Sequence, residues 1–71
     1  MNHPTVEQVW ERYLELMDWS GFPNLVNEHK REGRRKLREI KQATPWKRSE
    51  LYEFYTRKCH EHAMKKLSAN L

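Results

Sequence analysis

Apolar residues recur along the first quarter of the chain at the spacing of one helix face. They follow Thr5 and fall three and four positions apart, at Val6, Val9, Trp10, Tyr13, Leu14 and Met17. Thr5 and Gln8 have the spacing of a capping box, in which each side chain accepts a hydrogen bond from the other residue's backbone N–H. Gly21 can take the left-handed conformation that often ends a helix. The pattern therefore predicts a helix over residues 5–19.

A second, weaker helical pattern follows this one. Asn24 is a suitable cap, and one face then carries Val26, His29, Gly33, Leu37 and Ile40. Because glycine inside a helix costs about 1 kcal/mol relative to alanine, Gly33 marks either a break or a place where another helix passes close. Thr44-Pro45 ends the segment, since the residue before a proline is pushed away from helical angles. We expect this helix over residues 24–42.

A third apolar stripe consists of Leu51, Phe54, Tyr55, Cys59, Ala63 and Leu67, and it predicts a helix over residues 46–67. Its cap is Thr44 if Pro45 lies in the first turn, and Ser49 if the helix starts later. The three segments together predict an all-α fold, a small three-helix domain with a basic central helix. In this arrangement the first and third helices pack on the thin face of the second. Residues 1–71 form one domain, because a chain of 71 residues buries one small core.

Charge divides the chain into unlike parts. It is 34% charged with a net charge of +4, and its 11% aromatic content argues against disorder. Residues 5–19 carry a net charge of −3, residues 24–42 carry +4 and residues 45–71 carry +3. A basic balance favours nucleic acid or acidic protein surfaces as partners. A single cysteine and the lack of a long apolar run indicate a cytoplasmic protein without a membrane partner.

The basic residues concentrate between positions 28 and 46, and their three- and four-residue spacing places many of them on one broad side of a straight helix. Arginine matches phosphate geometry, and a tryptophan ring stacks on bases. The expected surface for nucleic acid or an acidic partner comprises Lys30, Arg31, Arg34, Arg35, Lys36, Arg38, Lys41, Trp46, Lys47 and Arg48. The plainer interpretation is a solvated helix face balanced by Glu28, Glu32 and Glu39.

A second surface is expected near the end of the first helix, where acidic and aromatic residues occur together. Tryptophan is favoured at protein interfaces. The expected protein-binding residues are Glu11, Glu15, Asp18, Trp19 and Phe22. A chain with two surfaces of opposite charge is suited to contact two different partners.

The cysteine and histidines do not form the pattern of a metal site or of a catalytic site. Cys59 and His62 lie one turn apart and His29 lies on the second segment, but zinc sites generally need four ligands at recognisable spacings. A nucleophilic cysteine needs an orienting third group and a pocket. We therefore expect no metal, no cofactor, no small-molecule substrate and no enzyme activity. A helix-turn-helix alternative makes the third helix the recognition helix, with Lys47, Arg48, Ser49 and Tyr52 at its start.

The sequence around the second stop resembles a segment of HNH-endonuclease-like proteins of tailed phages. In that family an Arg/Lys-rich helix is commonly followed by Ala-Thr-Pro, a nearby Trp and a short helix with an apolar residue and a Tyr. Here the matching residues are Ala43, Thr44, Pro45 and Trp46, followed by Leu51, Phe54 and Tyr55. The family's catalytic Asp-His pair and its later Asn and His residues are absent, and Cys59-His60-Glu61-His62 has no Asp-His step. The resemblance implies a phage-type origin and a nucleic-acid context, without catalytic residues.

These observations lead to two hypotheses about function. In the first, the protein is a small basic phage-type regulator that acts in transcription by binding host RNA polymerase or another nucleic-acid machine, with DNA or RNA contacted directly or not. In the second, it is a protein-binding inhibitor or adaptor that grips an acidic partner without contacting nucleic acid.

Overall fold

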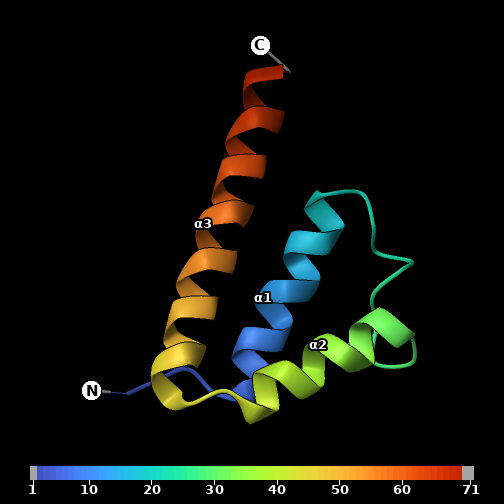
Figure 1. The fold of residues 1–71 in the computed structure, drawn as a ribbon. Helices are drawn as coiled ribbons and strands as arrows, with labels where there is room; N and C mark the ends of the chain where they lie inside the picture. Colours follow the sequence, from blue (N-terminus) through green and yellow to red (C-terminus); the bar gives the residue numbers. More distant parts are fainter. Residues whose placement is uncertain (1, 70–71) are drawn as a thin grey trace.

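The computed structural model describes residues 2–69, which fold into three helices without a strand among them. They are α1 (Val6–Trp19), α2 (Arg31–Gln42) and α3 (Pro45–Ala69), shown in Figure 1. The all-α three-helix fold expected from the sequence is therefore confirmed. Within the described residues, no helix is both long and apolar enough to cross a membrane.

The ends of α1 are those that its sequence predicts. The Thr5 side chain accepts from the Gln8 N–H at 3.2 Å, and the Thr5 N–H donates to Gln8 Oε1 at 2.8 Å. At the other end Gly21 has a φ of 85°. The Phe22 N–H donates to the Met17 carbonyl at 2.8 Å, and the Gly21 N–H donates to the Asp18 carbonyl at 3.1 Å. These two bonds form a Schellman motif, which satisfies the last carbonyls of the helix.

The second helix starts later than expected. A start capped by Asn24 is wrong, because residues 24–30 form turns and α2 begins at Arg31. The competing structure is local: Asn27 Oδ1 accepts from the His29 N–H at 2.8 Å, and the Asn27 carbonyl accepts from the Lys30 N–H at 3.0 Å. Asparagine side chains favour such turns over helix interiors. The helix then continues through Gly33, so this glycine is not a break.

The third helix starts at its proline. Thr44 Oγ1 accepts from the Lys47 N–H at 3.1 Å, which makes Thr44 the cap and removes Ser49 from that role. The helix ends at Ala69, two residues beyond the expected boundary. Of its apolar stripe, Tyr55 and Cys59 are buried, whereas Leu67 is 62% exposed.

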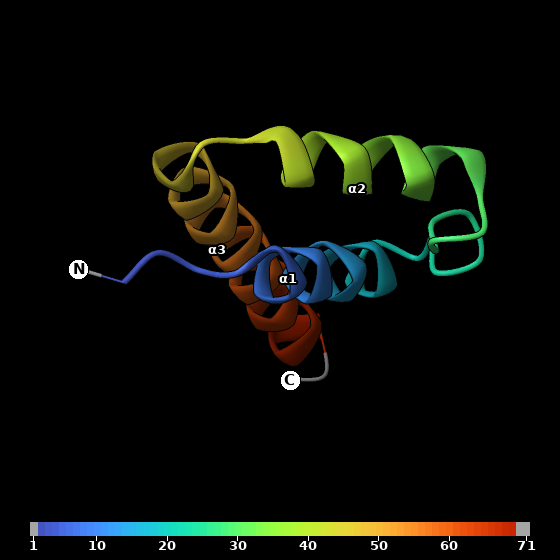
Figure 2. The same ribbon diagram turned by 90° about the horizontal axis from the view of Figure 1, so that it is seen from below.

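The packing differs from the expected arrangement, because α1 and not α2 is the shared element. α1 lies along α3 in the same direction, and α2 crosses beside them (Figures 1 and 2). Tyr13 of α1 and Tyr55 of α3 meet with ring centroids 5.6 Å apart. The buried core consists of Val9, Tyr13, Leu16, Val26, Ile40, Tyr55 and Cys59. α2 supplies only Ile40 and Gly33 to the interior, so its apolar face is too narrow to hold two helices.

The result is a flat molecule whose Cα atoms extend over 41 × 32 × 12 Å. The long helix α3 continues beyond the end of α1, as Figure 1 shows. α2 forms one margin of the plate, so the side of α2 that faces away from the core is open to solvent.

Candidate nucleic-acid interface

The outer side of α2 carries a continuous group of cations. Because Gly33 and Ile40 face the interior, helix geometry places Arg31, Arg35 and Arg38 on the opposite side, with Arg34 and Lys41 along one flank. All five side chains belong to exposed residues of one uninterrupted helix. We call these five residues the α2 cation face. From Arg31 to Lys41 the face extends over about 15 Å at the rise of an α-helix.

The acids of α2 neutralise only part of this face. Arg35 contacts Glu32 at 2.5 Å, and Glu39 contacts Lys36 at 3.3 Å. Arg34 Nη1 donates to the His29 carbonyl at 2.7 Å, which ties this residue to the preceding loop.

Four cations of the face have no carboxylate partner among residues 2–69: Arg31, Arg34, Arg38 and Lys41. The same holds for Lys30 at the cap position of α2. Lys36 instead lies on the inner flank, with its Nζ 5.7 Å from the centre of the Tyr13 ring. Of the three residues opposite the core, Arg31 and Arg38 are therefore unpaired, whereas Arg35 is paired with Glu32.

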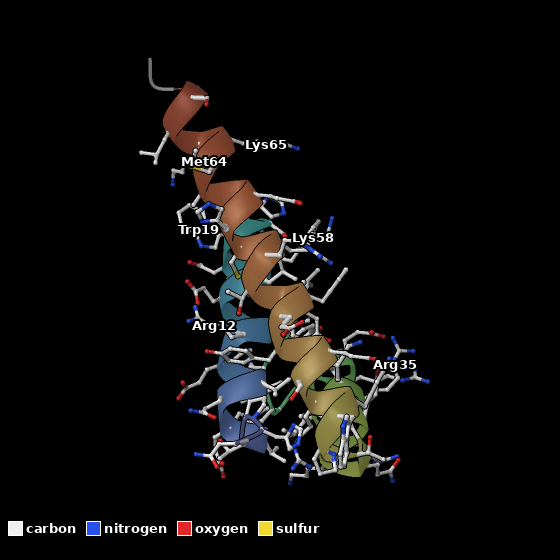
Figure 3. The ribbon with its side chains drawn as sticks, turned by 90° about the vertical axis from the view of Figure 1, so that its left-hand side faces the viewer. Arg12, Trp19, Arg35, Lys58, Met64 and Lys65 are labelled. Atoms are coloured by element: carbon white, nitrogen blue, oxygen red, sulfur yellow. The ribbon has the colours of Figure 1, made fainter. Side chains whose placement is uncertain are left out.

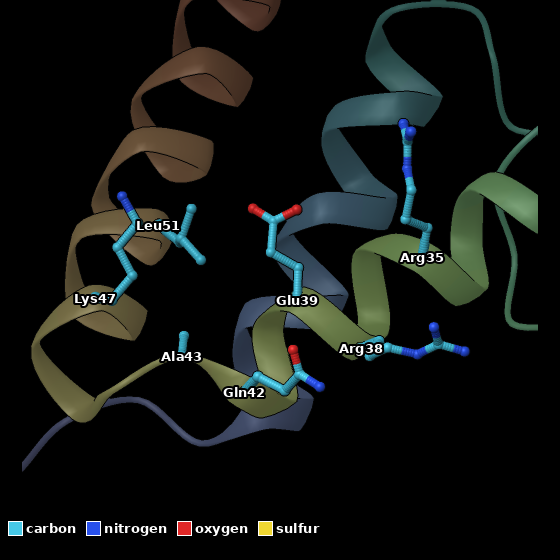
Figure 4. A pocket seen from close by; sticks show the side chains of 7 residues that line it. All are labelled: Arg35, Arg38, Glu39, Gln42, Ala43, Lys47 and Leu51. Carbon is cyan, nitrogen blue, oxygen red and sulfur yellow. The ribbon is translucent and has the colours of Figure 1, made fainter.

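A groove of about 390 Å³ lies between α2 and the start of α3 (Figure 4). It is lined by Arg35, Arg38, Glu39, Gln42, Ala43, Lys47 and Leu51. Figure 4 shows Glu39 and Leu51 extending toward the gap between the helices, while Arg38 extends away from α3. The groove therefore combines an apolar side on α3 with a largely cationic rim.

Arg48 differs from the other expected interface residues because its guanidinium makes hydrogen bonds inside the fold. Its Nε donates to the Pro4 carbonyl and its Nη1 donates to the Ala43 carbonyl, both at 3.2 Å. The side chain thus joins the N-terminal segment to the turn between α2 and α3. Lys47, by contrast, is exposed and lies 3.5 Å from Glu50.

Trp46 is the most exposed large apolar residue in the described part of the chain, with 72% of its surface accessible. The His3 ring lies beside it, with ring centroids 5.0 Å apart and planes tilted by 46°. His3 Nδ1 also shares a 2.8 Å hydrogen bond with Ser49 Oγ. The sequence pattern did not single out His3, because its partners lie more than 40 residues away and leave no local signal.

The expected acidic-aromatic surface is exposed at the end of α1. Glu15 is paired with Arg12 at 2.8 Å, while Glu11 and Asp18 are exposed on the side of α1 away from the core. Trp19 is 36% exposed and leans toward α3, where Lys66 Nζ lies 5.4 Å from its ring centre (Figure 3). Phe22 is 53% exposed in the following turn.

Three further large apolar residues are exposed, namely Leu25, Met64 and Leu67. Leu67 belongs to the apolar stripe expected for the third helix, whereas Leu25 and Met64 were not expected at the surface. Met64 appears on the same side of α3 as Trp19 in Figure 3.

The cysteine and histidines are distributed over separate parts of the fold. Cys59 is buried, its Sγ donates to the Arg12 carbonyl at 3.8 Å, and burial raises the pKa of its thiol. His62 Nε2 shares a 3.5 Å hydrogen bond with Ser20 Oγ, whereas His29 is exposed in the loop before α2. Residues 2–69 contain no cluster of three or more His, Cys, Asp or Glu side chains placed to hold a metal ion.

The side of α3 required by a helix-turn-helix arrangement is largely occupied. Ser49 contacts His3, Arg48 contacts Pro4, and the Arg12 guanidinium lies 5.5 Å from the centre of the Tyr52 ring. These contacts cover the start of α3 with α1 and the N-terminal segment. Of the four residues expected to enter the groove of a duplex, they leave Lys47 exposed.

No protein-family model, curated protein or solved structure matches this chain. The site is therefore interpreted from its own geometry. Exposed guanidinium and ammonium groups bind anions, and an exposed indole ring offers a flat apolar surface. Both features favour binding of an extended polyanion or an acidic surface.

Proposed function

We propose that this protein is a small, non-enzymatic regulatory protein that binds nucleic acid through the α2 cation face and acts in transcription. The observation that carries the proposal is the alignment of Arg31, Arg34, Arg35, Arg38 and Lys41 on the exposed side of one helix. A length of about 15 Å corresponds to roughly four base-pair steps of a duplex. Arginine is well suited to this task, because its planar donors match phosphate oxygens.

The most concrete form of the proposal is a phage-type regulator that docks on host RNA polymerase. The segregation of charge supports two separate contacts, since the acids Glu11 and Asp18 lie on α1 and the cation face lies on α2. Trp19 and Phe22 add exposed aromatic surface to the acidic end. In this arrangement the acidic-aromatic end meets the enzyme while α2 lies against DNA or the exiting RNA. The phage context rests on the resemblance at Ala43-Thr44-Pro45-Trp46.

The test is a charge reversal at the unpaired cations, Arg31→Glu with Arg38→Glu, with nucleic-acid affinity measured against salt concentration. Removing one cation–phosphate pair should reduce the slope of log K against log salt by about 0.9 on duplex DNA and about 0.7 on a single strand. The matched control is Arg57→Glu with Lys65→Glu, which changes the net charge equally on exposed positions of α3. If both double variants weaken binding equally, net charge alone explains the effect. This result would contradict binding through the α2 cation face.

The polymerase contact needs a separate experiment. Tagged protein is incubated with a bacterial lysate treated with nuclease, and the bound fraction is analysed for polymerase subunits. Phe22→Ala with Asp18→Lys should abolish their capture, while Arg31→Glu with Arg38→Glu should retain it. Absence of polymerase subunits from the wild-type capture would contradict this form of the proposal.

The alternative is a protein-binding inhibitor or adaptor, and the groove between α2 and α3 is the observation that favours it. Leu51 and Ala43 lie among the cations Arg35, Arg38 and Lys47, which suits an amphipathic acidic helix. Leu51→Gln, which adds no charge to the cationic rim, should then weaken partner binding without changing the affinity for nucleic acid. No nucleic-acid binding by the wild type at about 50 mM salt, where phosphate contacts are strong, would favour this alternative.

A further inference from the structure

The position of Trp46 indicates what form of nucleic acid the site takes. A tryptophan normally hides most of its large apolar surface, yet Trp46 is 72% exposed, against 36–62% for the other exposed large apolar residues described. Its exposure is not due to a poorly formed helix end. Trp46 is the second residue of α3, which starts at Pro45 and is capped by Thr44.

The ring is held in place on one side only. His3 packs beside it at 5.0 Å, and His3 is itself fixed by the 2.8 Å hydrogen bond to Ser49. The neighbouring Pro4 carbonyl is held by Arg48, which also binds the Ala43 carbonyl in the turn before α3. The N-terminal segment and the turn therefore support the indole, while the rest of its surface is open. A ring ordered before binding loses little conformational freedom when a ligand stacks on it.

Along the chain, the ring follows the C-terminal end of the α2 cation face. Trp46 lies five residues after Lys41, a length of chain that spans at most about 18 Å when fully extended. Lys47, the next residue, lines the same groove as Arg35 and Arg38. A chain of phosphates that lies along α2 therefore ends within reach of the indole.

Acidic residues limit where such a strand can continue. Glu50 and Glu53 follow within two turns of Trp46 on α3, and both are exposed. Glu53 has no cationic partner among residues 2–69, so it repels phosphates on this part of α3 and disfavours a path beyond the ring. The bases of an intact duplex are stacked on one another and offer no free face to a side chain, whereas the bases of a single strand do.

We infer that Trp46 is a stacking platform for an unpaired base and that the nucleic acid bound by the α2 cation face is single-stranded. This inference rests on the proposed function, because it assigns a strand to the same cations. It assigns Trp46 the base contact and the α2 cation face the phosphate contacts.

The first experiment compares a fluorescent ten-residue oligothymidylate with a duplex of the same length by anisotropy. Trp46→Ala should weaken single-strand binding by roughly 5- to 150-fold, the loss expected for one base–ring stack, and change duplex binding less than twofold. Trp46→Phe, which keeps a smaller ring, should fall between the wild type and Trp46→Ala. Leu67→Ala removes another exposed apolar side chain near the far end of α3 and should leave both affinities unchanged.

A second measurement uses the wild-type protein, so it does not depend on the folding of any variant. Ultraviolet irradiation of the complex with oligothymidylate should give a cross-linked peptide that contains Trp46, and not those with Trp10 or Trp19. Cross-links at either of these other tryptophans alone would overturn the inference.

The outcomes also separate this inference from the proposed function. If Arg31→Glu with Arg38→Glu weakens binding while Trp46→Ala does not, the cation face stands and the stacking role is wrong. If Trp46→Ala weakens binding of single strand and duplex equally, the inferred preference for single-stranded nucleic acid is wrong. If the wild type binds neither form, both the function and the inference fail.

Discussion

The α-carbon of Gly33 lies against the backbone of Asn27 with no room for a side chain between them. A Cβ built on Gly33 would overlap the Asn27 carbonyl oxygen and lie 2.9 Å from the Asn27 nitrogen. The loop before α2 therefore folds back onto the start of its own helix. A passing helix was one explanation of this glycine from the sequence, and the close approach is made by this loop instead.

We expect Gly33→Ala to destabilise the protein by roughly 1–2 kcal/mol. Alanine gains up to about 1 kcal/mol of helix propensity. The clash involves main-chain atoms that cannot move aside as a side chain can, so we take the overpacking cost in the upper part of its usual range, about 2–3 kcal/mol. Urea denaturation followed by circular dichroism measures the change. Gln42→Ala, exposed in the same helix, is the control and should stay within about 0.5 kcal/mol. A Gly33→Ala protein as stable as the wild type would mean that the loop does not pack there.

Arg48 and Lys47 are neighbours with different roles, and substitution should separate them. Arg48→Ala removes both hydrogen bonds to the Pro4 and Ala43 carbonyls, so we expect a loss of about 1–3 kcal/mol in the free energy of unfolding. Lys47→Ala removes only an exposed ion pair with Glu50 and should cost less than about 1 kcal/mol. Chemical denaturation of both variants checks this. Similar losses would show that Arg48 has no special structural role.

The thiol of Cys59 should react slowly in the folded protein. The side chain is 5% exposed, and burial raises the pKa of its thiol, so little reactive thiolate is present near neutral pH. Labelling by a thiol reagent should be roughly 10²–10⁴-fold slower than in urea, as expected if the reaction requires unfolding of a domain worth about 3–5 kcal/mol. The rate is followed by mass spectrometry. Rapid labelling under native conditions would place the thiol at the surface.

Stability should fall at alkaline pH. Burial raises the pKa of Tyr55 to about 12 from an ordinary 10.0, and it also raises the pKa values of Tyr13 and Cys59. At a pH below the pKa values of the unfolded chain, these groups are protonated in both the folded and the unfolded state, so their full contribution to stability is present. As the pH rises above about 9, the unfolded chain loses protons first, so the melting temperature should decline up to about pH 12.

Tyr55→Phe supplies the control for this pH dependence. Phenylalanine keeps the ring in the core but has no titrating hydroxyl, so the decline above about pH 10 should become shallower. A melting temperature that is constant up to about pH 12 in the wild type would contradict the expectation. So would an equally steep decline in the Tyr55→Phe protein.

The helix ends show what the sequence alone predicts well. The capping box at Thr5, the left-handed Gly21 and the Thr44-Pro45 start are set by residues a few positions apart. All the residues that form each of these helix ends lie within a few positions of one another in the sequence. The all-α fold and the start of α1 follow from them, while the sequence left the start of α3 open between Thr44 and Ser49 as caps.

The errors arise where distant or competing contacts decide the structure. The turn at Asn27 replaced the expected first two turns of the second helix, since its side chain and carbonyl bind nearby N–H groups. A related gap concerns Arg48, whose place at an interface stays a prediction: its charge is visible in the sequence, while its contact with Pro4, 44 positions away, is not. The support of Trp46 by His3 is a contact of the same kind.

The parallel alignment of α1 and α3 has a consequence for how the chain acquires its structure. The contacts Tyr13–Tyr55 and Ser20–His62 each join residues about 40 positions apart, so they form only when most of the chain is available. During synthesis, Val9 and Leu16 stay uncovered until α3 has left the ribosome. An isolated fragment with α1 and α2 lacks Tyr55 and Cys59 from the core, and we expect it to remain unfolded. We therefore expect the three helices to order together, in a single cooperative step.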